Sequence, residues 1–173
     1  MITSDEVTER FKTQPAPETL SVERIAYLER LVSQAKTAAA VFTQFTQEDV
    51  DRIVKPMVLA GLEHAQHLAQ LAVEETKIGV MEDKVIKNMV ATEFAYNYVK
   101  DKRTVGVIRE FPERNLVEMA EPIGVIFSLT PITNPTSTVL FKCIMAIKTR
   151  NAVIFSPHPN FSRAGLKAAF SQL

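Results

Sequence analysis

Two polar loops in the second half of the chain carry the residues best suited to hold a ligand. The first follows an apolar segment and precedes a predicted helix, and it consists of Leu129, Thr130, Pro131, Ile132, Thr133 and Asn134. Its hydroxyls, its amide and the free N–H groups of the helix start could hold a phosphate, a ribose or a carbonyl oxygen. The alternative is that these polar residues only turn the chain and cap the helix.

The second loop begins at Ser156 and reads SPHP, directly after another short apolar segment. In a parallel sheet it lies beside the first loop, because ligands bind beyond the carboxyl ends of such strands. A ligand-facing Ser156 or His158 is one interpretation. A rigid exposed turn is the interpretation favoured for a single histidine between two prolines.

Other residue types that do chemistry are sparse. Cys143, the single cysteine, falls within a predicted helix among apolar neighbours, which indicates packing rather than a nucleophile. His64 and His67 stand three residues apart without the further ligands that a metal needs, so they are predicted to be surface histidines. Five glycines form neither a G-x-G-x-x-G nor a Walker A motif. No two carboxylates stand out as an acid and base pair.

Composition narrows the class of protein. The 173 residues balance 20 Lys and Arg against 20 Asp and Glu, with a pI near 6.8. Such a chain has no basic field for nucleic acid or anionic lipid, so neither is a predicted partner. One cysteine cannot form an internal disulfide, which favours a reducing compartment and hence the cytoplasm. No apolar run reaches the roughly 18 residues of a membrane span, and no signal peptide is evident.

The first half of the chain has the pattern of helices. Residues 1–17 form a predicted N-terminal tail, and apolar residues then recur every three or four positions over 22–42. Thr46 and Asp49 resemble a capping box that opens a second helix over about 50–72, kinked or divided at Pro56, with Gly79 as a stop signal. A third helix is predicted from the apolar stripe Ile86, Met89, Val90, Phe94, Asn97 and Tyr98, with Glu82, Asp83, Lys84 and Lys87 on its solvent side.

From Thr104 the pattern alternates. Residues 105–108 and 116–121 suit two strands joined by a turn, and 123–129 suits a strand buried on both faces. Asn134 as N-cap and Pro135 as first residue predict a helix to about Thr149, followed by a strand over 152–155 and a helix over 162–171. The fold class is therefore α/β, with helices followed by the first βαβα of a parallel sheet. Two such strands cannot bury both faces alone, so the sheet is expected to be incomplete.

Several motifs in this half resemble one family. NPTST (134–138), KTRN (148–151) and FSPHP (155–159), together with FTQEDVD (45–51) and EDKVIKN (82–88), are similar to the CoA-acylating aldehyde dehydrogenases. The likeness is greatest to the N-terminal half of the bifunctional aldehyde-alcohol dehydrogenases and covers about 45–167. It implies a helical region over 18–103 and the start of an NAD-binding α/β domain over 104–173.

The resemblance implies NAD-dependent interconversion of an aldehyde plus coenzyme A with an acyl-CoA, through a cysteine thiolate that attacks the aldehyde. The small aldehyde or acyl-CoA is then the substrate, and the longer enzyme is expected to be a homo-oligomer. The family's NAD-contacting loop falls on 129–134. Ser156 stands where non-acylating relatives carry a ribose-contacting lysine, so its role stays open. Either Thr133 or Asn134 would hold the oxyanion.

Departures from the family pattern limit what this chain does alone. The family's catalytic cysteine and later cofactor segments lie downstream of Leu173, and Cys143 does not align with that nucleophile. Lys77 stands where a glycine is usual, which indicates a surface change at a helix end. The expected function is that of an N-terminal portion without a catalytic residue. A noncatalytic module that assembles with full-length subunits and a free-standing nucleotide-binding domain are the alternatives, and exposed sheet edges predict poor autonomous folding.

Overall fold

The computed structural model describes residues 20–158 of the chain, which divides into two compact units, Met1–Leu31 and Val32–Leu173. The first described element, helix α2 (Val22–Phe42), confirms the helix predicted over the same residues. Its apolar stripe is largely exposed, and Ala39 is the buried residue of the helix. The predicted tail over 1–17 and the predicted helix over 162–171 lie outside the described residues.

Two further helices follow, α3 (Gln47–Glu63) and α4 (Ala65–Thr76). The predicted capping box is confirmed, since the Thr46 hydroxyl accepts from the Asp49 N–H and the Asp49 carboxylate accepts from the Thr46 N–H. Of the two outcomes predicted for Pro56, a kink or a division, the division is wrong, because the helical segment divides at His64 instead. Pro56 lies on the exposed side of α3, where water can satisfy the carbonyl that has no N–H partner.

Helix α4 ends earlier than the predicted stop at Gly79. Its C-cap is Lys77, which adopts the left-handed conformation with φ 56°. The position expected to be a surface change at a helix end is thus exposed and at a helix end, as predicted. A side chain there is strained, because the left-handed region crowds Cβ against the following carbonyl oxygen.

The third predicted helix is present but presents the opposite face to the core. It comprises α5 (Met81–Met89), a π-helical turn η1 (Val90–Phe94) and α6 (Ala95–Val99). Residues predicted to be buried are exposed, including Phe94 at 64% and Tyr98 at 72%, whereas Lys84, predicted to face solvent, is 4% exposed. Glu82, Asp83 and Lys87 are exposed as predicted. The inward row includes the polar residues Lys84 and Asn88, which meet backbone carbonyls and a hydroxyl of neighbouring elements.

Strands β1 (Gly106–Phe111) and β2 (Leu116–Ala120) form the predicted antiparallel ribbon. A 3₁₀ turn, η2 (Pro112–Arg114), joins them and ends at Asn115 in the left-handed conformation. Within residues 20–158, this ribbon pairs with no other strand.

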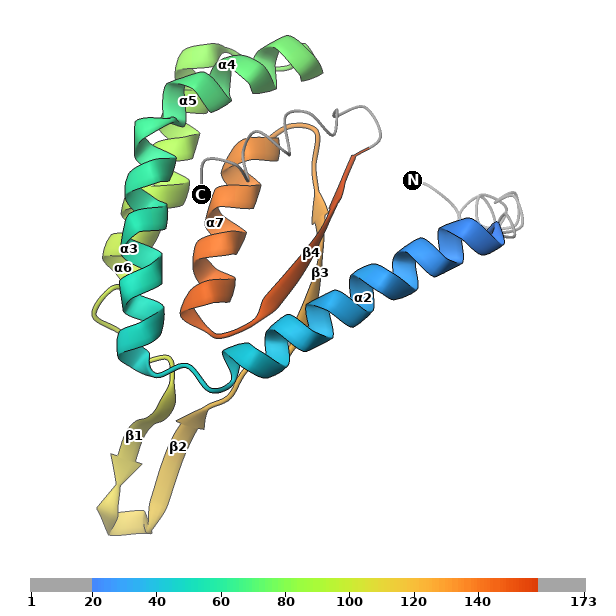
Figure 1. The fold of residues 1–173 in the computed structure, drawn as a ribbon. Helices are drawn as coiled ribbons and strands as arrows, with labels where there is room; N and C mark the ends of the chain where they lie inside the picture. The colour runs from blue at the N-terminus through green and yellow to red at the C-terminus, as the bar shows by residue number, and fades with distance from the viewer. Residues whose placement is uncertain (1–19, 159–173) are drawn as a thin grey trace, which may run out of the picture. The chain divides into compact units, whose positions relative to one another are not determined.

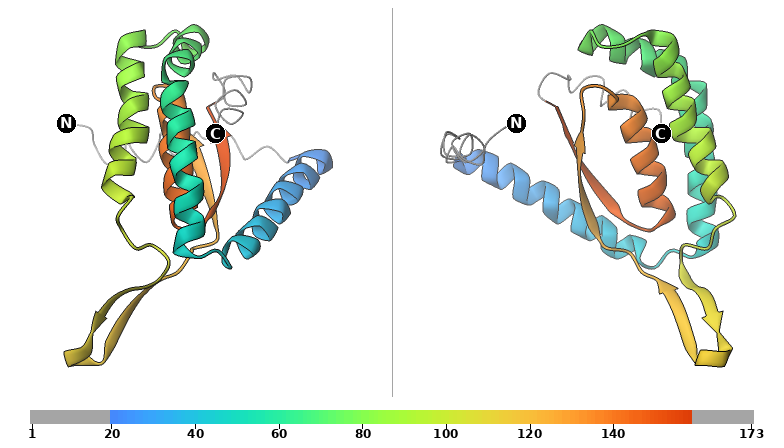
Figure 2. Two further views of the ribbon diagram at one scale, coloured as in Figure 1. Left: turned by 60° about the vertical axis from the view of Figure 1, so that its left-hand side comes forward. Right: turned by 180° about the vertical axis from the view of Figure 1, so that it is seen from behind.

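The second sheet is parallel, as the alternating pattern predicts. Strand β3 (Val125–Thr130) leads into helix α7 (Pro135–Lys148), which returns the chain to strand β4 (Ala152–Pro157). Figures 1 and 2 show α7 between this sheet and helices α3, α5 and α6. The core forms around α7, with Leu140 and Cys143 against Leu68 in one cluster and Ile144 against Val54 and Val58 in another.

Buried polar contacts fix the C-terminal end of α7. The ammonium of Lys148, which is almost fully buried, pairs with the Asp51 carboxylate and donates to the Lys100 carbonyl at 3.3 Å. The Lys148 carbonyl accepts from the Thr104 hydroxyl at 2.6 Å. Arg150 donates to the Thr43 carbonyl at 2.7 Å and so ties this end to the loop before α3.

Among the described residues, no helix is long and apolar enough to span a membrane.

Replacing Lys77 with glycine tests the strain at the end of α4. We expect Lys77→Gly to raise the free energy of unfolding by about 0.5–1 kcal/mol, because glycine adopts the left-handed conformation without a Cβ penalty. Gln70→Gly, in the middle of the same helix, is the matched control and is expected to lower it by about 1 kcal/mol. Urea denaturation of both variants measures the difference. A loss of stability in both would show that the conformation of Lys77 carries no strain.

Candidate functional site

The first predicted loop lies where β3 gives way to α7. Thr130 ends the strand, Ile132 to Asn134 form a bend, and Pro135 begins the helix, as the sequence predicts. Side chains alternate along the strand, so Thr130 faces α7 and is 3% exposed, whereas Leu129 is 69% exposed on the other face. The six predicted residues therefore do not share one surface.

Two polar atoms near this junction are buried without a hydrogen-bond partner in the described structure, the Thr130 hydroxyl and the side-chain oxygen of Asn134. The N-cap role predicted for the Asn134 side chain is wrong, because it makes no capping hydrogen bond. Its amide nitrogen lies 3.4 Å from the Thr133 hydroxyl instead. Buried polar groups are nearly always satisfied, so two unsatisfied ones make this strand-to-helix junction the candidate site.

Helix α5 holds this junction through two side chains that sequence reasoning missed. The Lys84 ammonium donates to the Thr133 carbonyl at 2.9 Å, and the side-chain oxygen of Asn88 accepts from the Thr136 hydroxyl at 2.9 Å. Burial, with a smaller contribution from the charge of Lys87, lowers the pKa of Lys84. Lys84 and Asn88 lie about one helical turn apart, and this spacing was the sequence signal that could have identified them. A lysine and an asparagine beside other charged residues also fit an exposed helix face.

The second predicted loop does lie beside the first. β4 pairs in parallel with β3, Leu129 opposite Ser156, and the His158 N–H donates to the Thr130 carbonyl at 3.1 Å. Ser156 belongs to the strand rather than to a loop, and its side chain lies on the sheet face of Leu129, away from α7. His158 is exposed.

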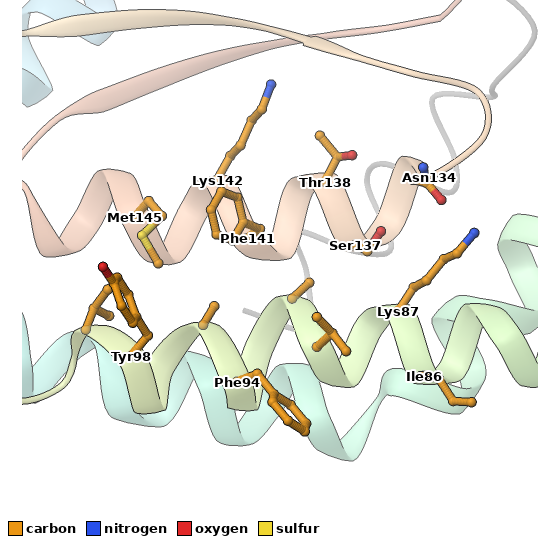
Figure 3. Close-up of a pocket in the computed structure, with 14 residues that line it drawn as sticks. Ile86, Lys87, Phe94, Tyr98, Asn134, Ser137, Thr138, Phe141, Lys142 and Met145 are labelled. Carbon is orange, nitrogen blue, oxygen red and sulfur yellow. The ribbon is translucent and has the colours of Figure 1, made fainter.

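A groove of about 720 Å³ starts at this junction and runs between α7 and the α5–α6 helical segment. Asn134 lies at one end and Met145 at the other, and Figure 3 shows Phe141 and Met145 on the side of α7 that faces Tyr98. The lining is mostly apolar, and it includes Ile86, Val90, Phe94 and Tyr98 of the exposed stripe. Lys142 is directed toward the strands, where it donates to the Ser128 hydroxyl at 2.9 Å.

The residues predicted to be inert are largely so. Cys143 is buried in the core, and burial raises the pKa of its thiol to about 12, so it packs as predicted. His67 is exposed, but His64 is half-buried, with its ring 2.9 Å from the Ala60 carbonyl oxygen, which corrects the prediction of a surface residue. Within residues 20–158, no cluster of three or more His, Cys, Asp or Glu could hold a metal ion.

Comparison with known proteins identifies relatives that are similar to this chain in sequence. The profile of the aldehyde dehydrogenase family matches residues 8–170. The bifunctional aldehyde-alcohol dehydrogenase AdhE of Escherichia coli is 46% identical over 150 residues, which are 87% of this chain and 17% of that protein. The succinate-semialdehyde dehydrogenase (acetylating) of Clostridium kluyveri is 44% identical over 132 residues, 76% of this chain and 29% of that one.

The fold is shared as well. The crystal structure of an acetylating aldehyde dehydrogenase from Geobacillus thermoglucosidasius superposes with a TM-score of 0.83 and 41% identity, over 90% of this chain and 34% of that one. The described helices and the start of the parallel sheet therefore match the N-terminal helices and first sheet strands expected from the resemblance. The chain spans between 17% and 34% of the length of these relatives.

Alkylation of Cys143 tests its packing role. Because its thiol pKa is raised from 9.0 to about 12, its thiolate fraction at neutral pH is about a thousandfold below that of a free thiol. We expect iodoacetamide to label the folded chain at least about a hundredfold more slowly than the chain in denaturant at the same pH. Cys143 is the only cysteine, so the labelled mass reports on it alone. Equal rates in the two conditions would contradict the buried position.

Proposed function

This chain belongs to the aldehyde dehydrogenase family, and we propose that it is the N-terminal portion of a CoA-acylating member, carrying part of the NAD site and no catalytic residue. The reaction of the longer enzyme is the conversion of an aldehyde, CoA and NAD into an acyl-CoA and NADH. The names of the acetylating relatives support this reaction class. The observation that carries the proposal is the pair of unsatisfied polar atoms on Thr130 and Asn134, where a strand meets a helix beside an apolar groove.

The residues of the β3–α7 junction fit a dinucleotide. Ligands of parallel sheets bind beyond the carboxyl ends of the strands, and the loop 129–134 occupies that place. The hydroxyl of Thr130 and the side-chain oxygen of Asn134 lack internal partners among the described residues, and the start of α7 leaves N–H groups free. NAD, when bound, supplies the hydride acceptor for oxidation of the aldehyde. The chain's own contribution is to orient the cofactor and the carbonyl.

The groove suits the aldehyde. An aldehyde offers one hydrogen-bond acceptor and an apolar chain, and the groove offers polar groups at Asn134 and apolar side chains along Phe141 toward Tyr98. Of the two candidates for the oxyanion donor, Asn134 lines the groove and Thr133 does not. We therefore assign the oxyanion contact to the Asn134 amide. The similarity to acetylating relatives supports coenzyme A as the co-substrate of the longer enzyme.

Turnover by this chain alone is not expected. A thiolate nucleophile must be exposed and have a lowered pKa, whereas Cys143 is buried and its pKa is raised. We further propose that the protein is cytoplasmic, because its single cysteine cannot form an internal disulfide.

An exposed sheet face favours a second candidate function, assembly with longer subunits of the same enzyme. Phe127 and Leu129 are exposed on the face of β3 opposite α7. Within the described residues, β3 and β4 pair only with each other, so each has an unpaired edge. Such edges and apolar faces bind further strands. A stable complex with a longer homologous subunit that forms without NAD, and without any effect of NAD on this chain, would support this second function.

Thermal unfolding with and without NAD tests the primary proposal. A ligand that binds only the folded state raises the midpoint, by about 2.7 kcal/mol of stability at a hundredfold excess over Kd. If this chain carries part of the NAD site, the unfolding transition shifts upward with NAD. A transition that is broad and unaffected by NAD would show that this chain does not form a usable part of the site.

The Thr130 hydroxyl provides a sharper test. Thr130→Val removes an unsatisfied buried group and keeps the shape, so we expect stability without NAD to stay equal or rise by about 1 kcal/mol. The NAD-dependent shift is expected to shrink, because a ligand contact is lost. Thr37→Val, at an exposed position of α2, is the matched control. A variant that is destabilised without NAD but keeps the full shift would contradict a ligand role for Thr130.

A further inference from the structure

We propose that Lys84 and Asn88 are positioning residues that hold the loop 131–134 and the first turn of α7 in their ligand-binding shape. The inference rests on the proposed function of that loop as part of the NAD site. Neither residue lines the groove, and each acts through a group of the junction that it contacts.

Lys84 is an unusual buried cation. It is 4% exposed, and among residues 20–158 no carboxylate forms an ion pair with it. Burying an ammonium costs free energy unless the group is hydrogen-bonded. The Lys84 ammonium donates to the Thr133 carbonyl at 2.9 Å. Gly79 lies beside its stem, since a Cβ at that position would be in van der Waals contact with Cε of Lys84, at 3.4 Å. The buried Lys84 ammonium thus lowers stability but holds the Thr133 carbonyl of the loop in one orientation.

That contact sets the direction of a donor. In a planar trans peptide, the carbonyl of one residue and the N–H of the next point in opposite directions. With the Thr133 carbonyl turned toward Lys84, the N–H of Asn134 points away from Lys84. Loss of the ammonium frees this peptide to rotate, and the donor loses its fixed orientation.

Asn88 uses both ends of its amide. Its nitrogen donates to the Ala65 carbonyl at 2.9 Å, and its oxygen accepts from the Thr136 hydroxyl at 2.9 Å, with the side chain 0% exposed. It therefore fixes the first turn of α7 against the start of α4. The two anchors fall on either side of Asn134, at Thr133 and Thr136, so its backbone is held while its side-chain oxygen stays unsatisfied.

Lys84→Met tests the first anchor, because it keeps most of the stem and removes the ammonium. We expect ¹⁵N order parameters of the Thr133 and Asn134 amides to fall from about 0.85 to below about 0.6, while the amides of α3 keep their values. We also expect the NAD-dependent shift of the unfolding midpoint to be lost. Lys84→Arg retains a cationic donor and is expected to restore part of both readouts. Lys55→Met, at an exposed position of α3, is the control expected to change neither.

Thr136→Val removes the hydroxyl that donates to Asn88 and so breaks the second anchor. If Lys84→Met does not fold, the same two measurements on Thr136→Val test the proposal. Unchanged loop order parameters in the folded variants would overturn the proposal, as would a rigid-to-mobile change that left the NAD-dependent shift intact. If the parent chain shows no NAD-dependent shift, the proposed function fails for this chain. The anchoring role is then still decided by the order parameters.

Discussion

The enclosure of α7 is the constraint on which the rest of the structure depends. Because this helix lies between the parallel sheet and the helices α3, α5 and α6, the polar groups at both of its ends must find partners inside the protein. At the C-terminal end, Lys148 reaches Asp51 and the Thr104 hydroxyl reaches the Lys148 carbonyl. At the N-terminal end, Asn88 meets Thr136. The junction that carries the candidate site is thereby fixed from the helical region.

The elements were predictable where the local signal and the tertiary environment agree. The capping box at Thr46 and the proline at the first position of α7 act within a few residues, so the sequence indicates those boundaries correctly. Pro56 misled because the cost of a proline depends on which side of the helix faces solvent. That property belongs to the packing and is not visible in the sequence around it.

Over the α5–α6 segment, the amphipathic pattern led to a wrong prediction of which helix face is buried. The hydrophobic stripe was correctly identified but assigned to the core, whereas most of it lines an open groove and the buried positions include the polar residues Lys84 and Asn88. A polar face can be buried when fixed carbonyls and hydroxyls stand opposite, as the Thr133 carbonyl and the Thr136 hydroxyl do. Those partners are about 50 residues distant in the chain. No short-range pattern could therefore assign the faces, although the loop at the strand end followed from the βαβ pattern alone.

The distribution of satisfied and unsatisfied groups argues that this junction is built for binding rather than for stability. Folding satisfies the carbonyl of Thr133 with a buried ammonium, yet leaves the hydroxyl of Thr130 and the side-chain oxygen of Asn134 without partners a few residues away. A junction shaped only by stability would carry a valine at Thr130 and need no buried lysine. Sites that bind ligands keep such locally unfavourable groups and offset them with rigid surroundings. Here the surroundings come from α5, so the helical region shapes the α/β site as well as covering it.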